Sequence, residues 1–299
     1  MPDTDDAPMP DAEPPRPNRR TVLTGTAAAV VGVAGIGVFG RWLLKPKSIA
    51  TPVTPTTVPR TALDGPTPPA VQSTPFQSGA RGRTVNVVVI RPEGTPVRDL
   101  PVCLALHGRG ADATMFANLG VPAALTAAVT AGTPAYAVVS VDGGDRYWTA
   151  ADPADDPRAM LSDELPGWLA ELGLRPEPRV LMGISMGAFG ALGHARTHHS
   201  AATAAISPAL FTSWNEARLR SVFASKAQWE EAEPLRHTQD LNSTALGVWC
   251  GTDDPFTPAA RQLVEKARPE RAELTDGAHD EAYWTAVLPD VLRWLGTHI

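Results

Sequence analysis

A single serine lies between two glycines at the end of an apolar run, and this pattern strongly limits the possible folds. The residues are Gly183-Ile184-Ser185-Met186-Gly187; they end the apolar run 180–184 and precede a helical pattern at 186–197. Glycines on both sides of the serine allow a tight turn between strand and helix without Cβ clashes. A serine in such a turn projects its Oγ above the sheet. The sequence therefore predicts that Ser185 is a nucleophile.

Strand-like and helical segments alternate from residue 83 to the end of the chain. The expected strands are 85–90, 102–106, 135–141, 180–184, 202–206, 246–250 and 271–275, and the expected helices are 113–131, 157–172, 186–197, 258–267 and 281–296. Pro289 is expected to kink the last helix or to restart it. This order predicts an α/β fold, with a mostly parallel sheet and helices on both faces. Residues 208–243 exceed an ordinary connection in length and are expected to form a small cap.

A second glycine-rich loop, His107-Gly108-Arg109-Gly110, follows the expected strand 102–106. Acyl transfer needs backbone N–H groups that stabilise an oxyanion. We expect the N–H groups of Arg109 and Met186 to form this oxyanion hole, since one belongs to this loop and the other follows the serine. His107 is expected to organise the loop, and the Arg109 side chain is a candidate contact for an anionic or polyhydroxyl substrate.

A serine hydroxyl needs a base within hydrogen-bonding reach and an acid that orients the base. His279 fits the base, since Gly277-Ala278-His279-Asp280 lies between the last expected strand and the last helix. The other histidines lie on or after the helix that follows Ser185, in the cap or at the tail: His194, His198, His199, His237 and His298.

The acid is expected in the turn Gly251-Thr252-Asp253-Asp254-Pro255, directly after the expected strand 246–250. Asp254 fits the usual position best, and Asp253 stays open as the alternative. Asp280 is expected at the start of the last helix, where a carboxylate interacts favourably with the helix dipole.

Together, these four motifs resemble the esterase D family of α/β-hydrolases over about residues 83–297. That family includes S-formylglutathione hydrolases, feruloyl-type esterases and secreted mycolyltransferases. The resemblance implies an α/β-hydrolase fold and an acyl-enzyme at Ser185, without a cofactor or metal. The mycolyltransferases use a glutamate as the triad acid and lack this His-Gly pair, so Asp254 and His107 favour the hydrolases.

Two aromatic residues, Tyr147 and Trp148, follow the strand that precedes the serine strand in the chain. They are candidates for lining the acyl or leaving-group pocket. Packing beneath a loop is an equally open alternative.

The first 82 residues do not follow the pattern of the folded part. Residues 1–20 are rich in proline, aspartate and alanine and are expected to form a disordered leader. Arg19 and Arg20 precede an apolar run, which resembles a twin-arginine export signal, although 22–44 is also long enough for a membrane anchor. Residues 21–50 are therefore expected to be one or the other. The Pro/Thr-rich residues 51–82 are expected to be a semi-rigid linker.

Charge and cysteine content limit the partners. The net charge is −6 with no basic block in the folded part, which argues against nucleic acid. Cys103 and Cys250 lie on strands that are not expected to be neighbours, so both are expected to be buried free thiols.

The sequence thus predicts a carboxylic ester hydrolase of the bacterial cell envelope, secreted or held to the membrane by its N-terminal segment. Its substrate would be a small-molecule or lipid ester. The alternative is an acyltransferase that moves the acyl group to a sugar or glycerol hydroxyl. A binding protein that has kept the fold without activity is less consistent with an intact set of serine, aspartate and histidine.

Overall fold

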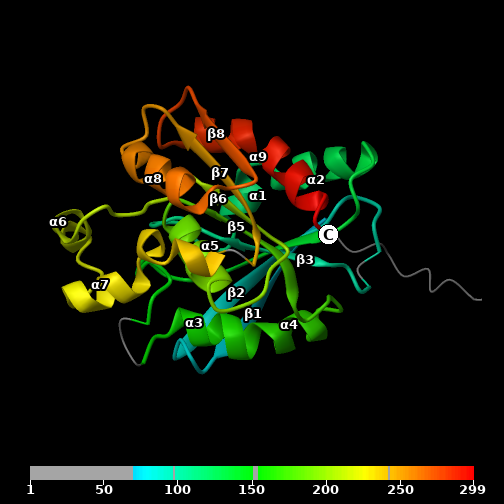
Figure 1. Ribbon diagram of the computed structural model, residues 1–299. Helices are drawn as coiled ribbons and strands as arrows, with labels where there is room; N and C mark the ends of the chain where they lie inside the picture. Colours follow the sequence, from blue (N-terminus) through cyan, green and yellow to red (C-terminus); the bar gives the residue numbers. More distant parts are fainter. Residues whose placement is uncertain (1–69, 97, 151–153, 242) are drawn as a thin grey trace, which may run out of the picture. The chain divides into compact units, whose positions relative to one another are not determined.

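The computed structural model describes residues 70–299, except 97, 151–153 and 242 (Figure 1). The expected leader 1–20, the expected signal or anchor 21–50 and most of the expected linker lie outside the described residues. Among the helices of the described part, none has both the length and the hydropathy needed to cross a bilayer.

Eight strands form one sheet in the order β1-β2-β4-β3-β5-β6-β7-β8. Their bounds are β1 (Val71–Ser78), β2 (Arg83–Ile90), β3 (Val102–Leu106), β4 (Ala137–Val141), β5 (Pro178–Ile184), β6 (Ala202–Ile206), β7 (Ala245–Gly251) and β8 (Arg271–Thr275). The pairs β1–β2 and β2–β4 are antiparallel, and every other pair is parallel. The prediction of a mostly parallel sheet is confirmed.

The prediction that the linker extends to residue 82 and that the domain starts at residue 83 is wrong, because β1 lies at 71–78 and pairs with β2 along its whole length. The proline, threonine and serine residues of β1 give it the composition of a linker, so the sequence pattern did not predict a strand here. Pro75 is tolerated because an edge strand can lack a backbone donor. Phe76 is buried and its ring stacks on Trp168 at 5.1 Å, which attaches β1 to the core.

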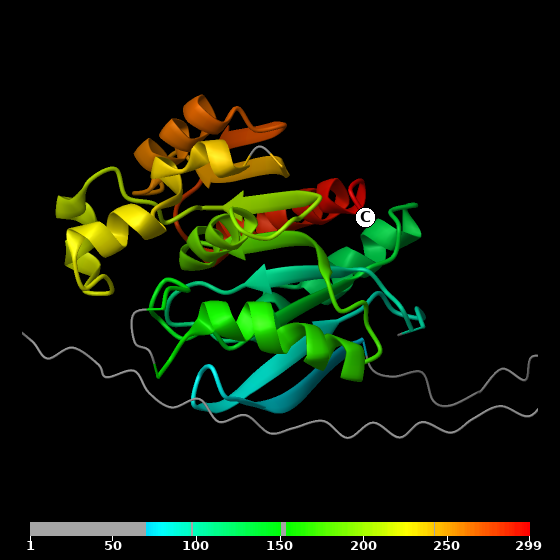
Figure 2. The same cartoon turned by 60° about the horizontal axis from the view of Figure 1, so that its bottom comes forward.

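Helices cover both faces of the sheet, as predicted (Figures 1 and 2). The described helices include α1 (Met115–Asn118), α2 (Val121–Thr130), α3 (Pro157–Ala159), α4 (Leu165–Glu171), α5 (Met186–Ala195), α6 (Trp214–Ala217), α7 (Lys226–Ala232), α8 (Thr257–Ala267) and α9 (Glu281–Gly296). Apolar residues of α1, α2 and α9 share one core cluster, and those of α4, α5 and α8 share the other. Strand β3 contributes Cys103 to the cluster with α1, α2 and α9 and Leu104 to the cluster with α4, α5 and α8. Both faces of β3 are therefore buried, which explains its uninterrupted apolar sequence.

Two expected helices are interrupted, and one is more regular than expected. Gly120, with φ +82°, separates α1 from α2 within the expected helix 113–131. A π-helical turn at Met160–Glu164 separates α3 from α4. Helix α9 continues through Pro289 without a restart. Cys103 and Cys250 are buried and free, as predicted, and burial raises the pKa of the Cys250 thiol to about 12.

Between β6 and β7 the chain forms the short helices α6 and α7 and several 3-10 turns, which lie at one end of the sheet (Figures 1 and 2). Glu233 holds this segment together, although its side chain is completely buried. Its carboxylate accepts hydrogen bonds from the backbone N–H of Phe211 at 3.1 Å and from Trp229 Nε1 at 3.0 Å. Burial raises the pKa of Glu233 to about 7 against these hydrogen bonds.

Candidate active site

Ser185 stands in a strained turn between β5 and α5, with φ +57° and ψ −118°. A non-glycine residue with this φ costs on the order of 1–3 kcal/mol, which the surrounding structure must offset. The flanking glycines are needed because backbones approach closely at both positions. A Cβ added to Gly183 would lie 2.1 Å from the carbonyl oxygen of Gly187, and one added to Gly187 would lie 1.8 Å from that of Leu106.

The structure brings Ser185, His279 and Asp254 together at the carboxyl edge of the parallel strands. His279 Nε2 lies 2.8 Å from Ser185 Oγ, and His279 Nδ1 lies 2.7 Å from Asp254 Oδ2. Asp254 follows β7, and His279 follows β8, so both come from the loops where parallel strands end. The Asp254 side chain is fully buried, whereas the neighbouring Asp253 is exposed. Of the two aspartates left open by the sequence, Asp254 is the one bonded to the histidine.

Asp254 is held as a carboxylate by several donors. Burial alone would raise its pKa, but hydrogen bonds from His279, from the Phe256 N–H and from the Ser207 hydroxyl outweigh this, so the pKa lies below its usual value. Ser207 Oγ in turn accepts a hydrogen bond of 3.0 Å from Trp284 Nε1. Ser207 and Trp284 therefore form a second layer behind the acid. A buried carboxylate fixed in this way can hold the orientation of the imidazole.

The loop after β3 lies against the start of α5, where the oxyanion hole was expected. A Cβ added to Gly108 would lie 3.6 Å from the Ser185 Cβ, so this loop contacts the nucleophile. The N–H of Met186 belongs to the first turn of α5 and has no acceptor inside its helix. The loop that contains Arg109 thus lies beside Ser185, and the assignment of the Arg109 and Met186 N–H groups to an oxyanion hole stays a prediction.

His107 organises this loop and takes no part in the contact with Ser185 Oγ. Its Nε2 accepts a hydrogen bond of 2.9 Å from the Gly143 N–H, so Nδ1 carries the proton and donates to the Gly108 carbonyl at 2.8 Å. Burial lowers the pKa of His107, which keeps the imidazole neutral. The Trp148 indole donates to the His107 carbonyl at 3.2 Å.

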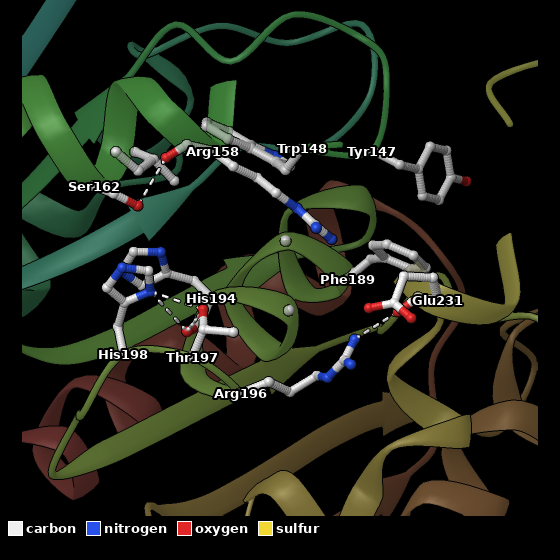
Figure 3. A pocket seen from close by; sticks show the side chains of 13 residues that line it. Tyr147, Trp148, Arg158, Ser162, Phe189, His194, Arg196, Thr197, His198 and Glu231 are labelled. Atoms are coloured by element: carbon white, nitrogen blue, oxygen red, sulfur yellow. Dashed lines mark hydrogen bonds between the residues drawn. The ribbon is translucent and has the colours of Figure 1, made fainter. Parts of the chain in front are cut away.

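Tyr147 and Trp148 are both buried. Trp148 packs its ring against Gly143 and Gly190, which fits the alternative of packing beneath a loop. Tyr147 contacts the rings of Phe189, Phe211 and Phe223. Both line a small cavity of about 70 Å³ beside α5, together with Arg158 and the stacked rings of His194 and His198 (Figure 3). Ser185, His279 and Asp254 are not among the residues that line it.

A larger groove of about 310 Å³ adjoins the site between the start of the cap and the turn after β7. The Ala209 N–H donates to the Ser185 carbonyl at 3.2 Å, and the Phe256 ring lies 5.2 Å from the His279 ring. The groove is lined by Leu210, Phe211, Thr212, Glu216, Leu219, Arg220, Pro255, Phe256, Pro258 and Ala259.

Sequence reasoning missed Ser207, Phe256, Trp284 and Arg220. Ser207 directly follows a predicted strand and Phe256 lies in the turn after another, so a survey of all strand ends would have found them. Arg220 lies in the cap, where no regular pattern marks it. No group of three or more His, Cys, Asp or Glu side chains that could hold a metal ion occurs among the residues that the structure describes.

A mostly parallel sheet with helices on both faces, and a serine in a strand–turn–helix elbow beside a histidine and an aspartate, define the α/β-hydrolase class. The chain belongs to the Esterase family, described as "Putative esterase", whose model matches residues 78–295.

Solved structures show the same fold. They include a ferulic acid esterase (TM-score 0.65, 20% identity, 76% of this chain and 97% of that one). An S-formylglutathione hydrolase from Agrobacterium tumefaciens has a TM-score of 0.63 at 15% identity, over 76% of this chain and 95% of that one. MPT51 of Mycobacterium tuberculosis has a TM-score of 0.62 at 22% identity, over 77% and 98%. No curated protein matches the chain.

Proposed function

We propose that this chain is a carboxylic ester hydrolase that works through a Ser185–His279–Asp254 triad. The observation that carries this proposal is the hydrogen-bonded series from Ser185 Oγ through the imidazole to Asp254, at 2.8 and 2.7 Å. Membership of the Esterase family supports the same reaction class. The ester hydrolases and the S-formylglutathione hydrolase among the similar structures support it at the level of the fold.

In the proposed reaction His279 Nε2 takes the proton from Ser185 Oγ as the oxygen attacks the ester carbonyl carbon. The N–H groups of Arg109 and Met186 stabilise the negative charge on the carbonyl oxygen. The tetrahedral intermediate then loses the alcohol, whose oxygen receives the proton from His279. A water molecule, deprotonated by the same imidazole, attacks the acyl carbon. The bond to Ser185 Oγ then breaks, Oγ takes the proton back from His279, and the acid is released. Throughout, the Asp254 carboxylate stabilises the imidazolium.

The test is the Ser185→Ala variant, assayed with a short-chain 4-nitrophenyl ester and a fluorescent fluorophosphonate. We expect kcat/KM to fall by about 10⁴-fold or more, since serine and histidine of such a unit act together. Labelling of the wild-type protein is expected and should be lost in the variant, with an unchanged circular dichroism spectrum. Ser162→Ala is the control, since the Ser162 hydroxyl donates to the Arg158 carbonyl and lies outside the candidate triad. Wild-type protein that neither turns over esters nor reacts with the probe would refute the proposal.

An added polyol distinguishes hydrolysis from acyl transfer to a sugar or glycerol hydroxyl, because the same residues serve both reactions. Hydrolysis predicts free acid as the main product with or without glycerol or trehalose. Transesterified product that grows at the expense of the acid would identify the chain as an acyltransferase instead.

We further propose that the enzyme works in the cell envelope. Arg19 and Arg20 ahead of the apolar run support export, and 22–44 is long enough to anchor the chain in the membrane. Replacing both arginines by lysine is expected to hold the full-length protein in the cytoplasm, measured by cell fractionation. Unchanged export of that variant would refute a twin-arginine signal.

A further inference from the structure

Arg220 lies in the groove beside the candidate triad without an acidic partner. Its guanidinium group lies over the rings of Phe256 at 5.2 Å and Phe211 at 5.7 Å. No ion pair joins it to any acid among the residues that the structure describes. Glu216 lines the same groove, but its carboxylate accepts from the Thr212 N–H and hydroxyl, each at 2.9 Å. The groove therefore offers a cation between aromatic walls.

A second cation, Arg109, lies on the loop after β3. Burial raises the pKa of Tyr147, the charges of Arg220 and Arg109 lower it, and the charge of Glu233 raises it. Arg109 is exposed and likewise forms no ion pair within the described part of the chain. The unpaired guanidinium group of Arg220 gives the groove a positive charge, which attracts anions.

The groove adjoins the imidazole that would protonate the leaving group. His279 must donate a proton to the leaving oxygen, so the alcohol portion passes close to the imidazole. The Phe256 ring packs 5.2 Å from that imidazole and also forms the floor under Arg220. A volume of about 310 Å³ is at the lower end of the usual range for small-molecule sites.

We propose that Arg220 binds a carboxylate on the alcohol portion of the ester, so that the enzyme prefers substrates whose leaving group is an anionic aromatic or aliphatic alcohol. This inference rests on the proposed esterase function. Arg220 supplies a planar donor pair for the carboxylate, and Phe256 and Phe211 pack against the apolar part of the leaving group. The positive charge of Arg109 attracts the same carboxylate at longer range.

The test compares 4-carboxyphenyl acetate with its neutral isostere 4-carbamoylphenyl acetate. The ratio of their kcat/KM values is expected to fall about tenfold in Arg220→Met, the size of one partly exposed charge-assisted hydrogen bond. Arg220→Lys should keep part of the preference. Arg218→Met, an exposed arginine of the same turn, is the matched control and should leave the ratio unchanged. A structural role for Arg220 would lower both kcat/KM values equally and leave their ratio intact, which would refute the proposal.

Two further measurements complete the test. In the wild-type protein the preference for the carboxylate should decrease between 20 and 500 mM salt, and this result needs no folded variant. A second pair of substrates, 4-nitrophenyl hemiglutarate and 4-nitrophenyl butyrate, differs by a carboxylate on the acyl portion. Arg220→Met should not change the ratio of their kcat/KM values. A change in this ratio alone would refute the assignment of the carboxylate to the alcohol portion. Turnover of neutral esters without any preference refutes only this inference, whereas absence of turnover and of fluorophosphonate labelling refutes the esterase function itself.

Discussion

Gly187→Ala is the most direct test of how the backbone positions the nucleophile. The added methyl group would lie 1.8 Å from the Leu106 carbonyl oxygen and 2.8 Å from that of His107. A contact this short must be relieved by a backbone shift of about 1 Å, since real Cβ atoms do not come closer than about 3 Å. The loop that shifts is the one that carries Gly108 and the Arg109 N–H. Misplacement of reacting groups by about 1 Å can cost on the order of 10²-fold in rate.

We therefore expect kcat/KM for a 4-nitrophenyl ester to fall by about 10²-fold in Gly187→Ala, together with a lower Tm. Gly193→Ala is the matched control, because it makes the same change in the same helix where the nearest atom is Arg158 Nη2 at 3.9 Å. There alanine should raise helix stability by about 1 kcal/mol and leave the rate intact. A Gly187→Ala enzyme within twofold of the wild-type rate would refute the close-approach argument, as would an equal loss in Gly193→Ala.

Three further predictions concern the triad acid, the serine behind it and the buried glutamate of the cap. Asp254→Asn should lower kcat by about 10⁴-fold with the fold intact, while Asp253→Asn should retain nearly full activity; equal losses would contradict the assignment of the acid. Ser207→Ala removes a donor to Asp254 and the acceptor of Trp284, so the pKa of Asp254 should rise, measured by NMR titration of its ¹³C-labelled carboxyl group; an unchanged pKa would contradict this role. Glu233 has a folded pKa of about 7, above its usual 4.5, so the folded state binds more protons between these values and stability falls as pH rises through this window. Glu233→Gln should remove this decline, measured by urea unfolding at pH 5 and pH 8; a decline of the same size in the variant would refute it.

The parts of the fold that the sequence predicted are those set by local periodicity. The apolar runs at 102–106, 180–184 and 202–206 became β3, β5 and β6 because strands buried on both faces need no polar alternation. The residues around Ser185, Asp254 and His279 were predictable for a related reason. Ser185 directly follows β5, and Asp254 and His279 lie in the turns after β7 and β8, so identifying the strand fixes the edge on which each side chain lies.

The parts that could not be predicted depend on contacts distant in the sequence. Strand β1 is polar and contains Pro75, and it exists because β2 offers it a partner. The role of Trp148 as packing beneath the oxyanion loop depends on Gly190, whose lack of a Cβ makes room for the indole 42 residues along the chain. Arg220 gains its position from Phe211 and Phe256, which flank it from two separate loops.

The edge position of β1 has a practical consequence for recombinant expression. A fragment starting at residue 83 would leave β2 as the new edge strand, and its residues Val87, Val88, Val89 and Ile90 are all buried in the complete sheet. An exposed apolar edge is a template for pairing between molecules, whereas the polar β1 with its proline protects against such pairing. Fragments that begin near residue 70 should therefore remain monomeric at concentrations where those that begin at 83 aggregate, a difference that light scattering would detect. Strand β1, which the sequence pattern placed in a linker, thus protects the sheet against self-association.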